Sequence, residues 1–256
     1  MGQPPIPPTP SEVNVSGKTV IITGGNAGLG YEAARQYLTL GASRVILACR
    51  SIARGKDAVA SLRADPTVKT SNPDALIEAF ELDLDDYQSG LRFAKKVKDE
   101  VKELDILLNN AGQVFLGHFD DEATFSKFFR YADTKTVVNA YVRRLAALAP
   151  SEVIVNNPCP GLVQTGLDKN LPFYLRIPMG LVRKSMARTV EEGARTLIFA
   201  SVVAGPETNG KFLQHNKVDP GAAFLNTPEG EEFIGRLWRE SVEDIAALDL
   251  ALSVYA

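Results

Sequence analysis

The chain has 256 residues, of which 45% are hydrophobic and 23% charged, and its formal net charge is −3. This is enough apolar material for one globular domain with a sizeable core, and the slightly acidic balance provides no basic field for nucleic acid. The two cysteines have neither metal-ligand spacing nor a disulfide pattern, so we expect no metal site. We find neither a membrane-length apolar run nor a signal peptide, so we expect a cytoplasmic protein.

The N-terminal part combines a proline-rich segment with a glycine-rich turn. Residues 1–15 lack periodicity and predict a flexible tail, followed by one domain over residues 16–256. The apolar run 19–22 predicts a strand and the pattern 31–38 a helix, and between them stands Thr23-Gly24-Gly25-Asn26-Ala27-Gly28-Leu29-Gly30. Glycines let a backbone bend and approach a pyrophosphate, whose charge the helix N-terminus attracts. An ordinary turn would also use glycine, but this strand–turn–helix context favours a dinucleotide.

The next apolar run, 44–49, ends at Arg50, about twenty residues beyond Gly30, where a dinucleotide fold meets the adenosine ribose. An acidic residue there would bind the 2′-hydroxyl of NAD(H). The guanidinium of Arg50 can instead pair with a 2′-phosphate, so we expect NADP(H). The alternative is a solvated arginine at a strand end.

Strands and helices continue to alternate along the chain. We expect a polar loop at about 63–74, strands at 76–82 and 104–108, and a crossover helix at 87–103. Such alternation predicts a Rossmann-like, doubly wound α/β fold, with a parallel sheet covered on both faces and the ligand at the carboxyl ends of the strands.

Five motifs occur in a fixed order over roughly residues 16–215, and together they are far more specific than any one of them. They are Thr23-Gly24 through Gly28 and Gly30, Asp83-Leu84, Asn109-Asn110-Ala111-Gly112, Tyr131 with Lys135, and Pro160-Gly161 with Thr165. In this set the chain resembles the short-chain dehydrogenase/reductase family, especially its retinol-dehydrogenase-like and fungal reductase members.

The resemblance implies a role for each motif. Tyr131 would be the catalytic acid and base, and Lys135 would hold the nicotinamide ribose and lower the pKa of the tyrosine. Asp83 and Leu84 would border the adenine, and Thr165 would contact the nicotinamide. The residues implied to bind the cofactor are Thr23, Gly24, Asn26, Gly28, Leu29, Gly30, Arg50, Asp83, Leu84, Asn110, Ala111, Gly112, Tyr131, Lys135, Pro160, Gly161, Val163 and Thr165.

The tyrosine–lysine pair fits proton transfer. A free tyrosine has a pKa of about 10 and is a poor base at neutral pH, whereas a nearby ammonium favours the phenolate. Residues four apart on a helix share one face, so Tyr131 and Lys135 would lie together. Reduction would transfer hydride from NADPH to a carbonyl carbon while the tyrosine protonates the oxygen. The alternative is a packing tyrosine beside a solvated lysine.

The chain departs from the family between Gly112 and Tyr131, which are only 19 positions apart. The resemblance implies that a helix with a catalytic asparagine and a strand with an orienting serine lie in this interval. A crossover connection needs at least about ten to twelve residues besides the strands and the next helix, so 19 positions cannot hold both elements. We therefore infer an internal deletion that removes one central strand and one helix. His118, and more weakly Ser126 and Asn139, are the candidates for the orienting role.

Two consequences of the deletion remain open. If one helix over 121–148 crosses to a strand at 152–156, that strand could move into the vacated slot and pair with residues 104–109, as we hypothesise. For function, the first hypothesis is an NADP-dependent oxidoreductase that interconverts a carbonyl and an alcohol. The second is a catalytically impaired dinucleotide-binding isoform or pseudoenzyme.

The C-terminal part contains an apolar, proline-punctuated segment at 168–186. By resemblance this is the lid over a small lipophilic substrate; a contact in a homo-oligomer is the alternative, and a membrane contact the least favoured. We expect a helix at 189–203, a last strand at 211–214 and a terminal helix at 229–248.

Overall fold

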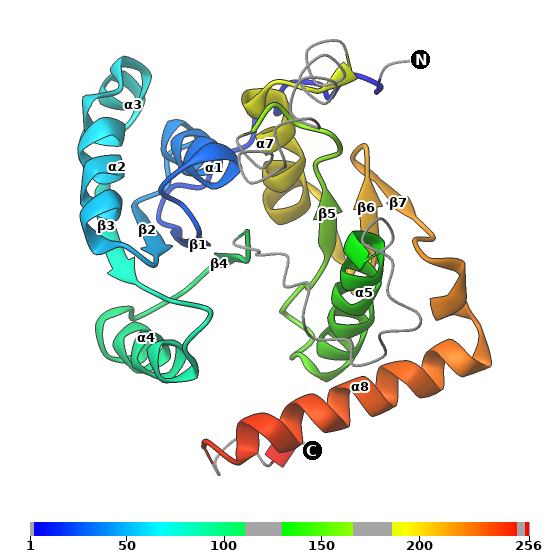
Figure 1. Cartoon of the computed structure of the whole chain (residues 1–256). Helices are drawn as coiled ribbons and strands as arrows, with labels where there is room; N and C mark the ends of the chain where they lie inside the picture. Colours follow the sequence, from blue (N-terminus) through cyan, green and yellow to red (C-terminus); the bar gives the residue numbers. More distant parts are fainter. Residues whose placement is uncertain (1–2, 111–129, 166–185, 250–253, 256) are drawn as a thin grey trace, which may run out of the picture. The chain divides into compact units, whose positions relative to one another are not determined.

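The structure is a computed structural model that describes residues 3–110, 130–165, 186–249 and 254–255 (Figure 1). The chain divides into two compact units. Unit 1 consists of residues 1–112 and 160–203, and unit 2 consists of residues 113–159 and 204–256.

Unit 1 contains a four-stranded parallel sheet in the order β3-β2-β1-β4, which is one half of a doubly wound Rossmann-like fold. This confirms the predicted fold class. The elements of unit 1 are β1 (Thr19–Thr23), α1 (Gly28–Thr39), β2 (Arg44–Cys49), α2 (Ile52–Ala64), α3 (Pro66–Ser71), β3 (Leu76–Glu81), α4 (Tyr87–Glu100), β4 (Ile106–Leu108), α7 (Val190–Ile198) and a π-helical turn, η3 (Phe199–Val203).

Both faces of this sheet are buried, because alternate residues of its central strands point to opposite sides. Val20 of β1 and Leu47 of β2 pack in one core with α1 and α7. Ile21 and Ile46 pack in a second core on the other face, with Phe80 and partly buried residues of α4. Full burial of such a side chain contributes about 1.5–3 kcal/mol, so the two layers hold the strand ends in place.

Two segments of unit 1 differ from the sequence prediction. The expected loop at 63–74 contains α3, whose start is capped by Asp65: its carboxylate accepts hydrogen bonds from the N–H groups of Thr67 and Val68, and Pro66 takes the first helical position. At the N-terminus, the segment expected to be flexible makes specific contacts. Ile6, for example, is only 3% exposed.

Unit 2 contains α5 (Arg130–Leu148), β5 (Asn157–Cys159), the short helix η4 (Pro206–Thr208), β6 (Phe212–Gln214), β7 (Lys217–Asp219), the short helix η5 (Ala223–Asn226) and α8 (Pro228–Ala246). Its sheet has the order β5-β6-β7, with β5 parallel and β7 antiparallel to β6. Strand β7 was missed by the sequence prediction. His215 and Asn216, both with positive φ, form the two-residue turn before it.

The hypothesis that a strand at 152–156 pairs with residues 104–109 is wrong. The strand forms later, at β5, where it pairs with β6, while β4 pairs with β1. Val153 and Ile154, which should have been interior strand residues, are 46% and 41% exposed. Pairing with β6 occupies one edge of β5, and residues 152–156 form no strand that could extend along residues 104–109.

Candidate functional site

The glycine-rich turn lies between β1 and α1, as predicted. Gly24 and Gly28 have φ of 65° and 57°, a region that favours glycine. The N–H of Gly24 donates to the carbonyl of Ala48 on β2, which ties the turn to the sheet. Helix α1 begins after Ala27, whose side chain offers no acceptor to the first helical N–H groups. The turn therefore fits a pyrophosphate, which could cap this helix N-terminus.

Asn110 locks this turn from the end of β4. Its Nδ2 donates to the carbonyl of Thr23 at 3.0 Å, and its own N–H donates to the carbonyl of Leu108. Gly30 makes this close approach possible: a Cβ added there would lie 2.5 Å from the Gly24 oxygen and 2.6 Å from Asn110 Nδ2. Four of the predicted cofactor residues, Thr23, Gly24, Gly30 and Asn110, thus form one arrangement. Ala111 and Gly112 lie outside the described residues.

Arg50 and Asp83 come to the same edge of the sheet, because β2 and β3 are paired through Cys49 and Glu81. The Arg50 guanidinium is 65% exposed and forms an ion pair with Asp85 at 3.4 Å. An exposed pair of this kind contributes only about 0–1 kcal/mol, so it leaves the guanidinium free to rearrange toward an anion.

The residues that flank this edge are also defined. The backbone N–H of Asp83 donates to Ser89 Oγ, and Leu84 beside it is 61% exposed. Cys49, just before Arg50, is buried, and this burial, together with the charge of Glu81, raises the pKa of its thiol.

The turn from Pro160 to Thr165 meets the glycine-rich turn across α7. A Cβ at Gly193 of α7 would lie 2.8 Å from Val163 and 3.0 Å from Leu29, so both side chains pack on this one glycine. Figure 1 shows α1 beside α7. Val163 forms a bridge with Arg188, and the N–H of Thr165 donates to the carbonyl of Val163. Two predicted cofactor motifs from distant parts of the sequence are thus brought together within unit 1.

In unit 2, α5 runs antiparallel to β5. Near the end of α5, Asn209 donates from its Nδ2 to the carbonyl of Ala146 and accepts at its Oδ1 from the N–H of Val155. Further back along α5, Asn157 Nδ2 donates to Asn139 Oδ1 at 2.5 Å. Lys135 precedes Asn139 by about 6 Å of helix and therefore lies toward the carboxyl end of β5, the end at which parallel sheets bind ligands.

The structure describes only some of the residues predicted to take part in catalysis. Tyr131 lies on α5 one turn before Lys135, but its side chain is not among those described; the Lys135 side chain is exposed. Asn139, a candidate for the orienting role, accepts at its Oδ1 a hydrogen bond from Asn157 Nδ2 of β5, and its orienting role stays a prediction. His118, Ser126 and all but the last residue of the segment 168–186, where the lid is expected, lie outside the described residues.

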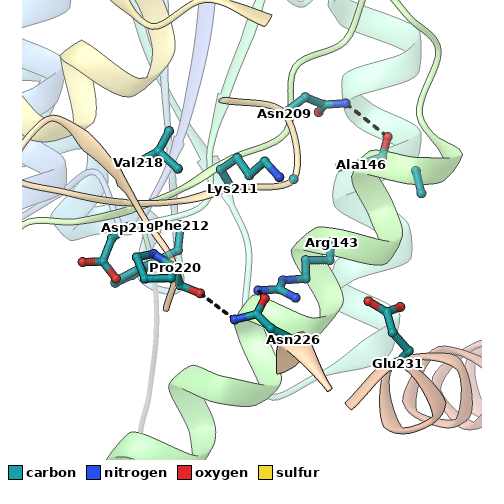
Figure 2. A pocket seen from close by; sticks show the side chains of 12 residues that line it. Arg143, Ala146, Asn209, Lys211, Phe212, Val218, Asp219, Pro220, Asn226 and Glu231 are labelled. Carbon is teal, nitrogen blue, oxygen red and sulfur yellow. Dashed lines mark hydrogen bonds between the residues drawn. The ribbon is translucent and has the colours of Figure 1, made fainter. Parts of the chain in front are cut away.

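A cavity of about 450 Å³ occupies another part of unit 2 (Figure 2). There Arg143 donates to the carbonyl of Leu225 and to Asn226 Oδ1, which fastens η5 to α5. Arg143 is eight residues beyond Lys135, about 12 Å along the helix. No residue of the predicted site lines the cavity, so we do not assign the chemistry to it. The lining residues are Arg143, Ala146, Ala147, Asn209, Gly210, Lys211, Phe212, Val218, Asp219, Pro220, Asn226 and Glu231.

The sequence prediction missed several residues that shape the site. Ser51 caps α2 beside Arg50 by accepting from the N–H of Arg54. Thr189 caps α7 by accepting from the N–H of Glu192, and the Thr-x-x-Glu spacing was a signal for this cap. Across the described segments, no group of three or more His, Cys, Asp or Glu side chains could hold a metal ion. No helix in the described part has the length and apolarity of a membrane span.

Comparison with known proteins gives consistent matches. Residues 18–130 match the short chain dehydrogenase family. The short chain dehydrogenase sor7 of Hypocrea jecorina is 60% identical, over 87% of this chain and 82% of that protein. The short chain dehydrogenase macD of Penicillium terrestre is 32% identical, over 96% of both chains.

Solved structures share the fold at lower identity. The Pseudomonas aeruginosa RhlG/NADP complex has a TM-score of 0.61 and 20% identity, over 79% of this chain and 96% of that chain. The L-sorbose reductase of Gluconobacter frateurii, solved with NADPH and L-sorbose, has a TM-score of 0.62 and 18% identity, over 83% of this chain and 98% of that chain.

Proposed function

The chain belongs to the short-chain dehydrogenase/reductase family of oxidoreductases, and on that premise we propose that it uses NADP(H) to interconvert a carbonyl and an alcohol on a small lipophilic substrate. The observation that carries the proposal is the glycine-rich turn locked by Asn110 and Gly30, with Arg50 at the end of the adjacent strand. NADP(H) is preferred over NAD(H) because a guanidinium can form two charge-assisted hydrogen bonds with a 2′-phosphate.

We assign the proton transfer to Tyr131 and Lys135. The cofactor, when bound, supplies the hydride. The Tyr131 hydroxyl then gives its proton to the carbonyl oxygen, and the Lys135 ammonium stabilises the phenolate that remains. Both residues belong to α5, and residues four apart on a helix share one face, so the two side chains would act together. The Pro160–Thr165 turn, which begins one residue after β5, would contact the nicotinamide.

A second candidate function is a dinucleotide-binding protein with impaired catalysis. The alignment with macD extends over 317 residues while this chain has 256, so at least 61 aligned positions, the difference between the two numbers, have no residue here. We place this gap between Gly112 and Tyr131, where the family resemblance implies the orienting serine. Without a donor that fixes the carbonyl, the tyrosine would have to orient the substrate alone.

Binding and turnover separate the two candidates. Purified protein is titrated with NADPH and with NADH by calorimetry, and NADPH oxidation is then followed with a panel of aromatic and aliphatic lipophilic carbonyls. The proposed enzyme binds NADPH more tightly and oxidises it with at least one carbonyl. NADPH binding without turnover on the whole panel favours the impaired protein, and absence of binding contradicts both.

A further inference from the structure

The N-terminal strap, which we define as residues 3–6, is docked on the Pro160–Thr165 turn of unit 1. The side-chain amide of Gln3 pairs with the backbone of Leu162 in both directions: Nε2 donates to the Leu162 carbonyl at 2.8 Å, and Oε1 accepts from the Leu162 N–H at 2.9 Å. The same Nε2 also donates to the carbonyl of Met186 at 3.1 Å. One side chain thus joins the two backbone segments that flank residues 166–185.

The strap is fastened by a buried cation. The side chain of Arg188 is only 3% exposed, and it donates to the carbonyl of Pro160 at 2.8 Å and to the carbonyl of Pro4 at 2.7 Å. Arg188 therefore holds the strap and the start of the turn at once. A buried guanidinium without its acceptors would strongly destabilise the fold, so the carbonyl groups of Pro4 and Pro160 are held in place.

The other end of the strap is attached to α7. The N–H of Ile6 donates to Glu192 Oε1 at 2.7 Å, and Arg195 donates to the carbonyl of Ile6 at 3.1 Å. The Ile6 side chain is buried. These contacts explain why residues 3–6, although they belong to a proline-rich segment without periodicity, hold a defined position: their backbone and side-chain polar groups find partners on α7 and on the turn.

Gly161 gives independent support for the docking of the strap on the Pro160–Thr165 turn. Its φ is 75°, and a Cβ added there would meet Gln3 Oε1 and would lie 2.7 Å from an Arg188 nitrogen. The space that a side chain would fill is taken by the strap and its cation. The residue type at 161 therefore fits the docked strap as well as the turn itself.

We propose that Gln3 and Arg188 are positioning residues, through which the N-terminal strap holds the Pro160–Thr165 turn in the geometry that receives the nicotinamide end of the cofactor. The inference rests on the proposed cofactor function, in which Thr165 contacts the nicotinamide. Neither residue touches the substrate or the reacting atoms. The strap's hydrogen bonds go to the turn and to α7, and it reaches Leu29 of the glycine-rich turn only through Gly193 of α7, so we expect its main effect at the nicotinamide end of the dinucleotide.

The test compares two ligands on the full-length chain. NADPH carries the nicotinamide, whereas 2′-phospho-ADP-ribose contains only the part that Arg50 and the glycine-rich turn would bind. For Gln3→Ala and Gln3→Glu we expect NADPH to bind about tenfold more weakly, equivalent to ~1.4 kcal/mol. We expect 2′-phospho-ADP-ribose to bind as it does to the unsubstituted chain. Glu12→Ala, a change at an exposed residue of the same N-terminal segment, should leave both affinities unchanged.

Hydrogen exchange provides a readout that does not depend on the cofactor. The Leu162 N–H donates to Gln3, so its exchange should accelerate in Gln3→Ala and not in Glu12→Ala. Equal losses for both ligands, or no loss for either, would overturn the inference. An unsubstituted chain that binds neither ligand would overturn the proposed function and this inference together, and that result would be evident before any variant is made.

Discussion

Gly30 offers the sharpest perturbation of the glycine-rich turn. In Gly30→Ala the new methyl group would lie 2.5 Å from the Gly24 carbonyl oxygen and 2.6 Å from Asn110 Nδ2. Overpacking of this kind costs about 1–3 kcal/mol. Loss of the Asn110–Thr23 hydrogen bond adds about 0.5–1.5 kcal/mol, and the better helix propensity of alanine returns up to about 1 kcal/mol. We therefore expect a net destabilisation of about 0.5–4.5 kcal/mol.

The matched control is Gly90→Ala, within α4, where an added Cβ has no atom within 4 Å. It should stabilise the chain by about 0.5–1 kcal/mol. Urea unfolding without nucleotide measures both free energies, and calorimetric titration with NADPH measures affinity. We expect at least tenfold weaker binding for Gly30→Ala and no change for Gly90→Ala. If Gly30→Ala matched the unsubstituted chain in both assays, the proposed lock between this turn and β4 would be refuted.

Three further predictions concern other residues. Arg50→Ala should weaken NADPH binding about tenfold to a hundredfold in calorimetry, because charge-assisted hydrogen bonds to the 2′-phosphate contribute about 1.5–3 kcal/mol. The affinity for NADH should not change. Equal losses of affinity for NADPH and NADH would contradict the assignment of Arg50 to the 2′-phosphate. Burial raises the pKa of Asp105, but hydrogen bonds from Lys18 and the Thr19 N–H, with the charge of Lys18, together hold that pKa below its ordinary value of 3.8. This carboxylate therefore stabilises the fold above about pH 4 and loses that effect as the pH falls further. Asp105→Asn should reduce the fall of Tm at acid pH, and an unchanged fall of Tm would contradict this role of Asp105. Tyr37→Phe removes a buried 2.6 Å hydrogen bond to Ser201 and should cost about 1 kcal/mol in urea unfolding; no loss would argue against that bond.

Local patterns were sufficient to predict most of unit 1. Its strands are short apolar runs bounded by polar or glycine residues, so β2 was predicted with its observed bounds. The glycine-rich turn and Arg50 could be found because their function depends on a fixed distance from a strand end. Helix α3 was missed because its signal, an Asp-Pro cap, is small compared with the polar residues that follow it.

The failures involve long-range pairing. No local pattern indicates that the strand forms at 157–159 rather than at 152–156, or that it pairs with β6, because strand pairing depends on residues far away in the chain. The docking of the strap was also hidden, because its partners Leu162, Arg188 and Glu192 are more than 150 residues away in the chain. Composition alone suggested disorder, and the tertiary contacts override it.

The most direct test of the account is NADPH oxidation by Tyr131→Phe with a carbonyl that the unsubstituted chain reduces. The proton-transfer role predicts that turnover falls at least about a hundredfold while the calorimetric affinity for NADPH is retained. Tyr141→Phe is the control in the same helix, because the ring that packs on Trp238 is kept; its turnover should be close to that of the unsubstituted chain. Undiminished turnover in Tyr131→Phe, or no turnover in the unsubstituted chain with any carbonyl, would contradict the proposed mechanism.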